Sequence, residues 1–162
     1  MAPKFGTSGL RGLVVELTPD LVSNHVRAFL AAFPDIRTLY VGRDLRPSSP
    51  VIATTVAGAA LEVGVDVVDC GALPTPALAL AALDTGGGAI MVTGSHIPAD
   101  RNGLKFYTPA GEISKADERD ILDHLGQSPA GNRPPGQSKT DPNAGDRFVD
   151  RYRRAFGSTA LD

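Results

Sequence analysis

Residues 38–68, TLYVGRDLRPSSPVIATTVAGAALEVGVDVV, decide the fold class of this chain. The stretch begins and ends with short apolar runs, residues 38–41 and 65–68, which are typical of buried strands. Between them, Ser49-Pro50 has the composition of a helix start, and Gly64 is suited to end that helix. The predicted buried face of the helix consists of Ile52, Val56, Ala59, Ala60 and Val63. A strand, a helix and a strand in this order predict an α/β fold with parallel strands.

The rest of the chain repeats this alternation. Further helices are predicted to start at Thr18-Pro19, at Thr75-Pro76, and at Ser114, where Asp117 completes a capping box. Further strands are predicted at residues 89–92 and 104–107, and a hairpin around Phe5-Gly6 and residues 13–15. We therefore expect a three-layer α/β/α sandwich, in which helices cover both faces of a mixed, mostly parallel sheet of about four strands.

The composition changes after residue 125. Residues 1–125 form the predicted core, and residues 126–145 are rich in Gly, Pro, Ser, Asn and Gln, as in a linker or mobile loop. Residues 146–162 then contain a short amphipathic helix with several arginines. We expect this helix to lead toward a further domain.

The charge balance excludes several classes of partner. The 162 residues carry 18 acidic and 16 basic side chains, a net charge of −2, which favours neither nucleic acid nor an anionic membrane. No apolar run is long enough to cross a bilayer, and the first residues do not resemble a signal peptide.

The single cysteine, Cys70, excludes an internal disulfide and is expected to be a small buried residue. His25 and His124 are expected on solvated helix faces. A cytoplasmic protein is predicted.

Side chains that could bind or react with a ligand lie near the ends of the predicted strands. Ser95 and His96 follow the strand 89–92, within Thr93-Gly94-Ser95-His96-Ile97-Pro98, and Lys105 closes Asn102-Gly103-Leu104-Lys105. The loop Gly42-Arg43-Asp44-Leu45-Arg46 follows the strand 38–41. Ligands of open α/β sheets bind at the carboxyl ends of the strands, so both loops are expected at one rim. Glycine allows such a loop unusual backbone angles, and arginine binds phosphate through paired hydrogen bonds.

Each of these residues also has a structural interpretation. Ser95 by itself could simply belong to a turn, and His96 could be a surface imidazole. Lys105 could be a solvated lysine of an edge strand. Asp44 is better explained as a residue that ties neighbouring loops together than as a catalytic group.

In combination, three motifs resemble the α-D-phosphohexomutase superfamily, and bacterial phosphomannomutases and phosphoglucomutases in particular. They are Phe5-Gly6-Thr7-Ser8-Gly9-Leu10-Arg11-Gly12, Gly42-Arg43-Asp44-Leu45-Arg46, and residues 93–98 with residues 102–105. Their order and spacing agree with the amino-terminal domain of these enzymes. The resemblance implies interconversion of hexose 1-phosphate and hexose 6-phosphate, of mannose or glucose, through a bisphosphorylated sugar.

The resemblance also implies roles for individual residues. Ser95 would carry the transferred phosphoryl group and, through that phosphate, bind Mg²⁺. Lys105 would be a general acid or base that also binds substrate, with a pKa lowered by burial and by Arg11. Arg11 would lie near the reacting phosphate, and His96 would orient the serine. Thr7 and Ser8 would help to bind substrate.

Two departures from the family pattern stand out. Ile97 replaces the asparagine that usually follows the serine-histidine pair. The aspartate-rich metal loop, the sugar-selecting loop and the phosphate-binding loop of domains II–IV have no counterpart in the 162 residues. We therefore expect this chain alone to be inactive as a mutase, with the other Mg²⁺ ligands in domain II. The alternative is a separate module that binds a phosphosugar or carries a phosphate without isomerising it.

Overall fold

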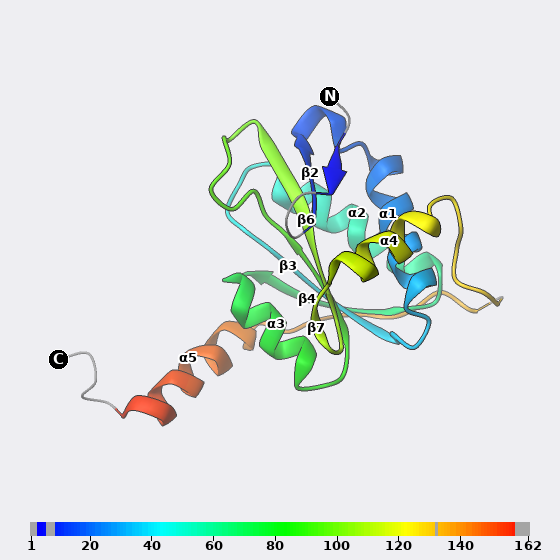
Figure 1. Ribbon diagram of the computed structural model, residues 1–162. Helices are drawn as coiled ribbons and strands as arrows, with labels where there is room; N and C mark the ends of the chain where they lie inside the picture. The colour runs from blue at the N-terminus through cyan, green and yellow to red at the C-terminus, as the bar shows by residue number, and fades with distance from the viewer. Residues whose placement is uncertain (1–2, 6–8, 132, 158–162) are drawn as a thin grey trace.

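The computed structural model describes residues 3–5, 9–131 and 133–157, and it consists of a central sheet between two layers of helices (Figure 1). The strands are β1 (Lys4–Phe5), β2 (Leu10–Leu13), β3 (Thr38–Arg43), β4 (Asp66–Ala72), β5 (Gly88–Val92), β6 (Arg101–Thr108), β7 (Gly111–Glu112) and β8 (Ser138–Thr140). The helices are α1 (Pro19–Ala32), α2 (Ser49–Glu62), α3 (Thr75–Leu83), α4 (Lys115–Asp123) and α5 (Ala144–Phe156), with a 3₁₀ turn at Val14–Glu16. The predicted α/β class and three layers are confirmed.

The sheet is larger than predicted and less parallel. Within the described residues it has eight strands in the order β1-β2-β6-β5-β3-β4-β8, with β7 paired to β6. Strand β3 is parallel to β4 and β5, and β4 is parallel to β8, whereas the other four pairings are antiparallel. The chain returns from β5 to β6 through a short loop without a crossover helix, which is possible only between antiparallel strands. Strands β1, β7 and β8 are too short to show a period in the sequence.

Apolar side chains fill both faces of the sheet. One core contains Phe29, Val56, Ile90, Phe106 and Ile121, beneath α1, α2 and α4. The other lies beneath α3 and α5 and contains Tyr40, Cys70, Leu78, Met91 and Tyr107. Ile90 and Met91 are adjacent in β5 but belong to opposite cores, because successive side chains of a strand alternate between faces.

Two of the predicted helix starts have the expected cap. The Thr18 hydroxyl accepts a hydrogen bond from the Leu21 amide, and Ser114 and Asp117 form the capping box. Helix α2 begins at Ser49, and its N-cap residue, Ser48, makes no side-chain cap. Helix α3 begins at Thr75 after Pro74. Proline in the first turn is common to α1, α2 and α3, which is where its fixed φ angle favours helix formation.

The prediction for His25 is wrong. Its side chain is 8% exposed, and its Nδ1 donates a hydrogen bond of 2.8 Å to the Leu21 carbonyl. The ring lies near Phe5, with 6.0 Å between the centroids, and burial lowers the pKa of His25. Helix α1 packs against both α2 and α4, and α4 comes from a distant part of the sequence.

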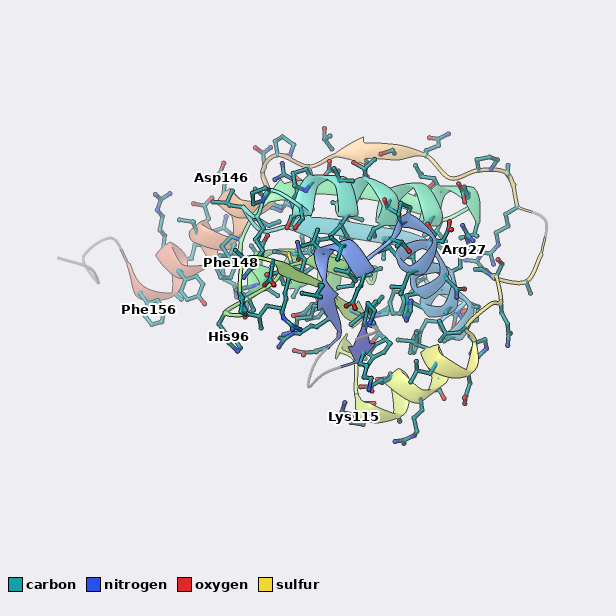
Figure 2. The ribbon with its side chains drawn as sticks, turned by 90° about the horizontal axis from the view of Figure 1, so that it is seen from above. Arg27, His96, Lys115, Asp146, Phe148 and Phe156 are labelled. Carbon is teal, nitrogen blue, oxygen red and sulfur yellow. The ribbon has the colours of Figure 1, made fainter. Side chains whose placement is uncertain are left out.

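The end of the described chain contains a strand that its composition did not indicate. Residues 138–140, within the segment predicted as linker or mobile loop, form β8 at the edge of the sheet. Helix α5 then packs on α3 and extends away from the sheet, with Phe156 toward its far end (Figures 1 and 2). Among the described residues, no helix is long and apolar enough to cross a membrane.

Candidate functional site

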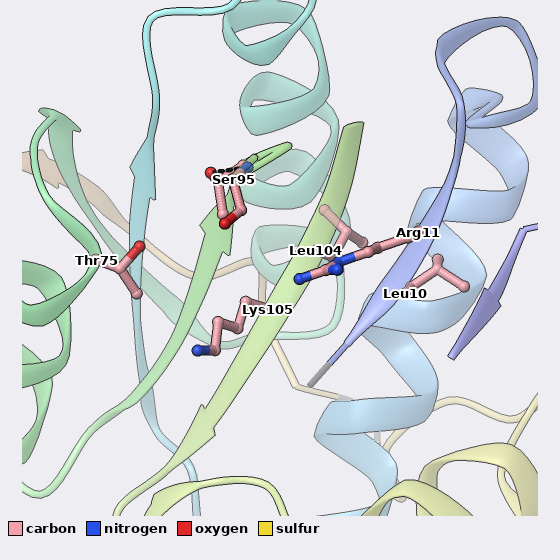
Figure 3. Close-up of a pocket in the computed structure, with 7 residues that line it drawn as sticks. Leu10, Arg11, Thr75, Ser95, Leu104 and Lys105 are labelled. Carbon is pink, nitrogen blue, oxygen red and sulfur yellow. Dashed lines mark hydrogen bonds between the residues drawn. The ribbon is translucent and has the colours of Figure 1, made fainter. Parts of the chain in front are cut away.

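A pocket of about 170 Å³ lies where β5, β6 and β2 meet the start of α3. Its lining residues are Leu10, Arg11, Thr75, Thr93, Ser95, Leu104 and Lys105 (Figure 3). The structure thus brings Arg11, which is distant in the sequence, close to Ser95 and Lys105, the two residues with which it was predicted to act. The pairing of β6 with both β5 and β2 positions them around one hollow.

Ser95 has an unusual backbone conformation. It is the only non-glycine residue of the described chain with a positive φ, at 50°. A left-handed conformation costs about 1–2 kcal/mol for a residue with a side chain, so the surrounding contacts must hold it. The Ser95 amide donates to the Thr93 hydroxyl at 2.9 Å, and the Ser95 side chain is exposed to solvent. The flexibility expected of Gly94 is therefore not what shapes the loop, because the strained residue is the serine itself.

Asp44 connects the two rim loops, as the structural interpretation predicts. One oxygen of its carboxylate accepts from the Thr93 hydroxyl and the Gly94 amide, each at 3.0 Å. The other accepts from the Arg46 amide at 3.0 Å and the Ser49 hydroxyl at 2.5 Å. Burial alone would raise the pKa of Asp44, but these hydrogen bonds to its charged form lower it.

Lys105 is more basic than the sequence analysis expects. Its Nζ lies 3.0 Å from the Glu112 carboxylate and 5.6 Å from the centre of the Tyr107 ring. Partial burial by itself would lower the pKa of Lys105, but the hydrogen bonds and charges of Glu112 and Tyr107 raise it. The predicted lowering is therefore wrong, and Lys105 is a protonated cation at neutral pH. The acidic neighbour, Glu112, lies on the returning strand β7, which has no recognisable pattern in the sequence.

The other predicted site residues differ in how closely they approach the pocket. The Arg11 side chain reaches into it from β2 (Figure 3), and no hydrogen bond or ion pair joins its guanidinium to another described residue. His96 is exposed and points outward (Figure 2), with its Nδ1 3.3 Å from Ser95 Oγ. Thr7 and Ser8 lie outside the described residues. Arg43 lines a separate, mainly apolar hollow with Leu45 and Leu73.

Three residues of the site were missed in the sequence analysis: Thr75, Tyr107 and Glu112. Thr75 lies across the pocket from Arg11 (Figure 3), where α3 follows the carboxyl end of β4. Its Thr-Pro pair was interpreted only as a helix start. Tyr107 follows Lys105 by two residues in β6 and is paired with Glu112 of β7. The alternation of a strand could have placed Tyr107 on the Lys105 face, but Glu112 depends on the register of the hairpin.

The residues that the structure describes do not by themselves make a complete cation site. Among residues 3–5, 9–131 and 133–157, no three side chains of His, Cys, Asp or Glu are grouped so that they could bind a metal ion. Asp44, the carboxylate nearest to the Ser95 loop in the hydrogen-bond network, is already surrounded by four donors. A divalent cation at the pocket would need most of its oxygen ligands from elsewhere.

Comparison with known proteins agrees with this geometry. Residues 2–130 match the family model described as phosphoglucomutase/phosphomannomutase, alpha/beta/alpha domain I. The chain belongs to this family. It is 52% identical over 127 residues to a phosphomannomutase of Sinorhizobium fredii, an alignment that covers 75% of this chain and 27% of the relative. It is 34% identical over 172 residues to a phosphoglucosamine mutase of Desulforudis audaxviator, which covers 99% of this chain and 38% of the relative.

The three-dimensional comparison gives the same assignment. A crystal structure of a phosphoglucomutase/phosphomannomutase family protein from Burkholderia thailandensis superposes with a TM-score of 0.79 at 27% identity. The superposition covers 94% of this chain and 35% of that structure. The chain therefore corresponds to domain I of the family, and it spans between about a quarter and two fifths of the length of the relatives it matches.

Proposed function

We propose that this chain is the phosphoserine-bearing domain of an enzyme that interconverts hexose 1-phosphate and hexose 6-phosphate. The observation that carries the proposal is the position of Ser95, an exposed hydroxyl held at the sheet rim beside two cationic side chains, Arg11 and Lys105. Membership of the phosphoglucomutase/phosphomannomutase family supports it. Residues 1–125 would be the catalytic core, residues 126–145 the connecting segment, and residues 146–162 the helix that leads toward domain II. A cytoplasmic location follows from the predicted metabolic role.

The proposed reaction moves one phosphoryl group in each direction. In the first half, the bond between phosphorus and Ser95 Oγ breaks while a sugar hydroxyl oxygen bonds to phosphorus and loses its proton, and Ser95 Oγ takes up a proton to become a hydroxyl. In the second half, Ser95 Oγ loses its proton and bonds to the phosphorus of the other phosphate of the sugar bisphosphate, and the sugar oxygen whose bond to that phosphorus breaks takes up a proton. Because the phosphate carries negative charge throughout, fixed positive charge and alignment are the main contributions of the protein.

The residues of the pocket suit these needs. Arg11 and Lys105 would bind the reacting phosphate, and the raised pKa of Lys105 keeps it protonated as a proton donor to the leaving oxygen. His96 would orient the Ser95 hydroxyl through their contact of 3.3 Å. Thr7 and Ser8 would complete the substrate-binding surface. Glu112 would release Lys105 when a phosphate arrives, because a phosphate competes with a carboxylate for the same cation.

Mg²⁺ is the metal ion that suits a phosphoryl group of this kind, because it binds phosphate and carboxylate oxygens and neutralises their charge. This chain would supply one ligand, an oxygen of the Ser95 phosphate. The carboxylate ligands would belong to domain II. Because the carboxylate ligands and the sugar-selecting loop would lie outside this chain, we expect it to accept a single phosphoryl group on Ser95 from a sugar bisphosphate, but not to sustain the interconversion of hexose phosphates.

The substrate would be a hexose phosphate, with mannose and glucose as first choices. Two relatives named phosphomannomutase, from Sinorhizobium fredii and Salmonella muenchen, are 52% and 48% identical to this chain. Selection between hexoses would depend on domains outside the 162 residues. A sugar bisphosphate would serve as both intermediate and activator.

Intact-mass measurement tests the proposal. The chain is incubated with glucose 1,6-bisphosphate and Mg²⁺, and we expect the addition of one phosphoryl group, located at Ser95 by peptide mapping. Ser95→Ala should abolish the addition, whereas Ser128→Ala, which removes another exposed hydroxyl, should not. The same chain should show no conversion of mannose 1-phosphate or glucose 1-phosphate in a coupled assay.

The outcomes separate the proposal from its alternative. A chain that binds the bisphosphate but never accepts a phosphoryl group on Ser95 would be a phosphosugar-binding module. Phosphorylation at a residue other than Ser95 would contradict the proposed mechanism. Sustained turnover by this chain alone would show that the site does not need carboxylates from another domain.

A further inference from the structure

The Arg46 side chain is enclosed by the backbone of the Ser95 loop. Its Nη1 donates to the carbonyls of Pro98 at 2.7 Å and Arg101 at 3.0 Å. Its Nη2 donates to the carbonyls of Ile97 at 2.5 Å and Ser95 at 3.2 Å. Its Nε lies 3.4 Å from the Asp44 carboxylate, and the side chain is only 17% exposed. All three guanidinium nitrogens are therefore occupied, which leaves none to bind a phosphate.

The loop itself has few other hydrogen bonds to maintain its shape. Between residues 94 and 101, the internal backbone bonds are Ile97 to Gly94 at 3.0 Å and Arg101 to Pro98 at 3.1 Å. Arg46 satisfies four carbonyls of this stretch at once. This use matches the flat, forked geometry of guanidinium, whose N–H groups point outward in one plane.

Gly94 provides the space for this arrangement. A Cβ atom at residue 94 would lie 2.2 Å from both Cζ and Nε of Arg46, a distance that no side chain tolerates. Gly94 does not have a positive φ, so the reason for glycine here is the close approach of the guanidinium and not the backbone angle. The glycine and the arginine thus depend on each other.

The ends of the loop are fixed by the same short segment of chain. Asp44 holds the Thr93 hydroxyl and the Gly94 amide. At the other end, the buried Asn102 amide donates to the hydroxyls of Ser48 at 2.8 Å and Ser49 at 2.9 Å. Residues 44–49 therefore hold the start, the middle and the end of the Ser95 loop.

We propose that Arg46 is a positioning residue for phosphoryl transfer at Ser95. It holds the carbonyl of the strained serine and three carbonyls that follow it, so that the left-handed conformation persists and the hydroxyl stays at the pocket of Arg11 and Lys105. The inference rests on the proposed function, since it assumes that Ser95 accepts a phosphoryl group. Arg46 acts through the loop backbone and never contacts the transferred group.

Three variants test the proposal: Arg46→Ala, Arg46→Lys and Gly94→Ala. The control is Arg37→Ala, which removes an exposed arginine just before β3 and leaves the loop untouched. The first measurement is amide hydrogen exchange across residues 94–101, which does not depend on any activity. The second is the initial rate of Ser95 phosphorylation by glucose 1,6-bisphosphate. The third is the same rate after addition of methylguanidinium or, for comparison, methylammonium.

We expect at least tenfold faster exchange of the loop amides in all three variants, and a phosphorylation rate lowered about 100-fold, the scale of an ångström-sized misplacement. Arg46→Lys should resemble Arg46→Ala, because one ammonium cannot reach four carbonyls in a plane. Methylguanidinium should partly restore Arg46→Ala, whereas methylammonium should not. The rate should recover through its maximum value and not through the apparent affinity for the bisphosphate.

Two outcomes would contradict the proposed role of Arg46. Wild-type phosphorylation in Arg46→Ala, with or without faster loop exchange, would show that Arg46 does not position Ser95. Full activity in Arg46→Lys would show that charge alone is sufficient. If Arg46→Ala does not fold, Gly94→Ala and Arg46→Lys decide the question. If the unchanged chain accepts no phosphoryl group, the proposed function fails, while loop exchange still shows whether Arg46 holds the loop.

Discussion

Replacing Asp44 by asparagine should destabilise the domain substantially, although the change adds no volume. The carboxylate accepts four hydrogen bonds, two on each oxygen, from Thr93, Gly94, Arg46 and Ser49. An asparagine keeps one acceptor oxygen, so two of the four donors would face an NH₂ group instead. Hydrogen bonds to a charged group contribute about 1.5–3 kcal/mol each, and two of them give about 3–6 kcal/mol. Because the Asp44 side chain is 23% exposed and can rearrange, we expect the lower end, about 3 kcal/mol.

Urea and thermal unfolding of both proteins measure this loss. For a domain of this size, about 3 kcal/mol corresponds to a decrease in Tm of roughly 6–12 °C. The control is Asp35→Asn, at an exposed carboxylate, which should change the free energy of unfolding by less than about 0.5 kcal/mol. A loss below about 1 kcal/mol for Asp44→Asn would refute the hydrogen-bond count.

The difference in unfolding free energy between wild type and Asp44→Asn should depend on pH, and the lowered pKa of Asp44 sets the direction of that dependence. The pKa of Asp44 is lowered in the folded state, so its carboxylate stabilises the fold fully above the ordinary aspartate pKa of about 3.9. As the pH falls below that value and through the lowered pKa, the stabilisation disappears. The difference between wild type and Asp44→Asn should therefore be constant from about pH 7 to pH 5 and shrink toward pH 3. A difference that stays constant to pH 3 would show that charge does not contribute.

Three further predictions concern other parts of the domain. Glu112→Gln should lower the pKa of Lys105, because partial burial lowers this pKa and the carboxylate charge that counteracts it is removed. NMR titration of the Lys105 Nζ resonance measures the change, and an unchanged pKa would rule out the carboxylate as the cause of the raised value. Cys70, buried with a thiol pKa raised to about 12, should react with iodoacetamide at pH 8 far more slowly in the folded chain than in urea, and equal rates would contradict its burial. Phe106→Ala should lower the free energy of unfolding by about 3–5 kcal/mol, because the ring is fully buried against Phe29 and Phe5; a loss under about 1 kcal/mol would show that the cavity collapses without cost.

The sequence by itself determined the local elements and the candidate reactive groups. Helix starts at Thr18-Pro19 and Ser114 depend on side chains and proline rings within one turn, so neighbouring residues are sufficient to predict them. The buried strands β3 and β5 are recognisable because short, continuous apolar runs are typical of strands buried in the core. Ser95, Arg11 and Lys105 were recognised from motif order, and the pocket contains all three.

Tertiary structure decided whatever depends on pairing between distant segments. The short segments β7 and β8 belong to the sheet because two or three residues become a strand only when a neighbour supplies their hydrogen bonds. The pKa of Lys105 is raised because the register of β6 and β7 places the Glu112 carboxylate 3.0 Å from the Lys105 Nζ. No pattern in the local sequence predicts that contact. Gly94 is explained by Arg46, a residue 48 positions earlier that reaches it only in the folded chain. Composition and short-range periodicity reflect interactions within single helices and strands. The chemistry of a side chain depends instead on the charges and hydrogen-bond donors that folding brings to it.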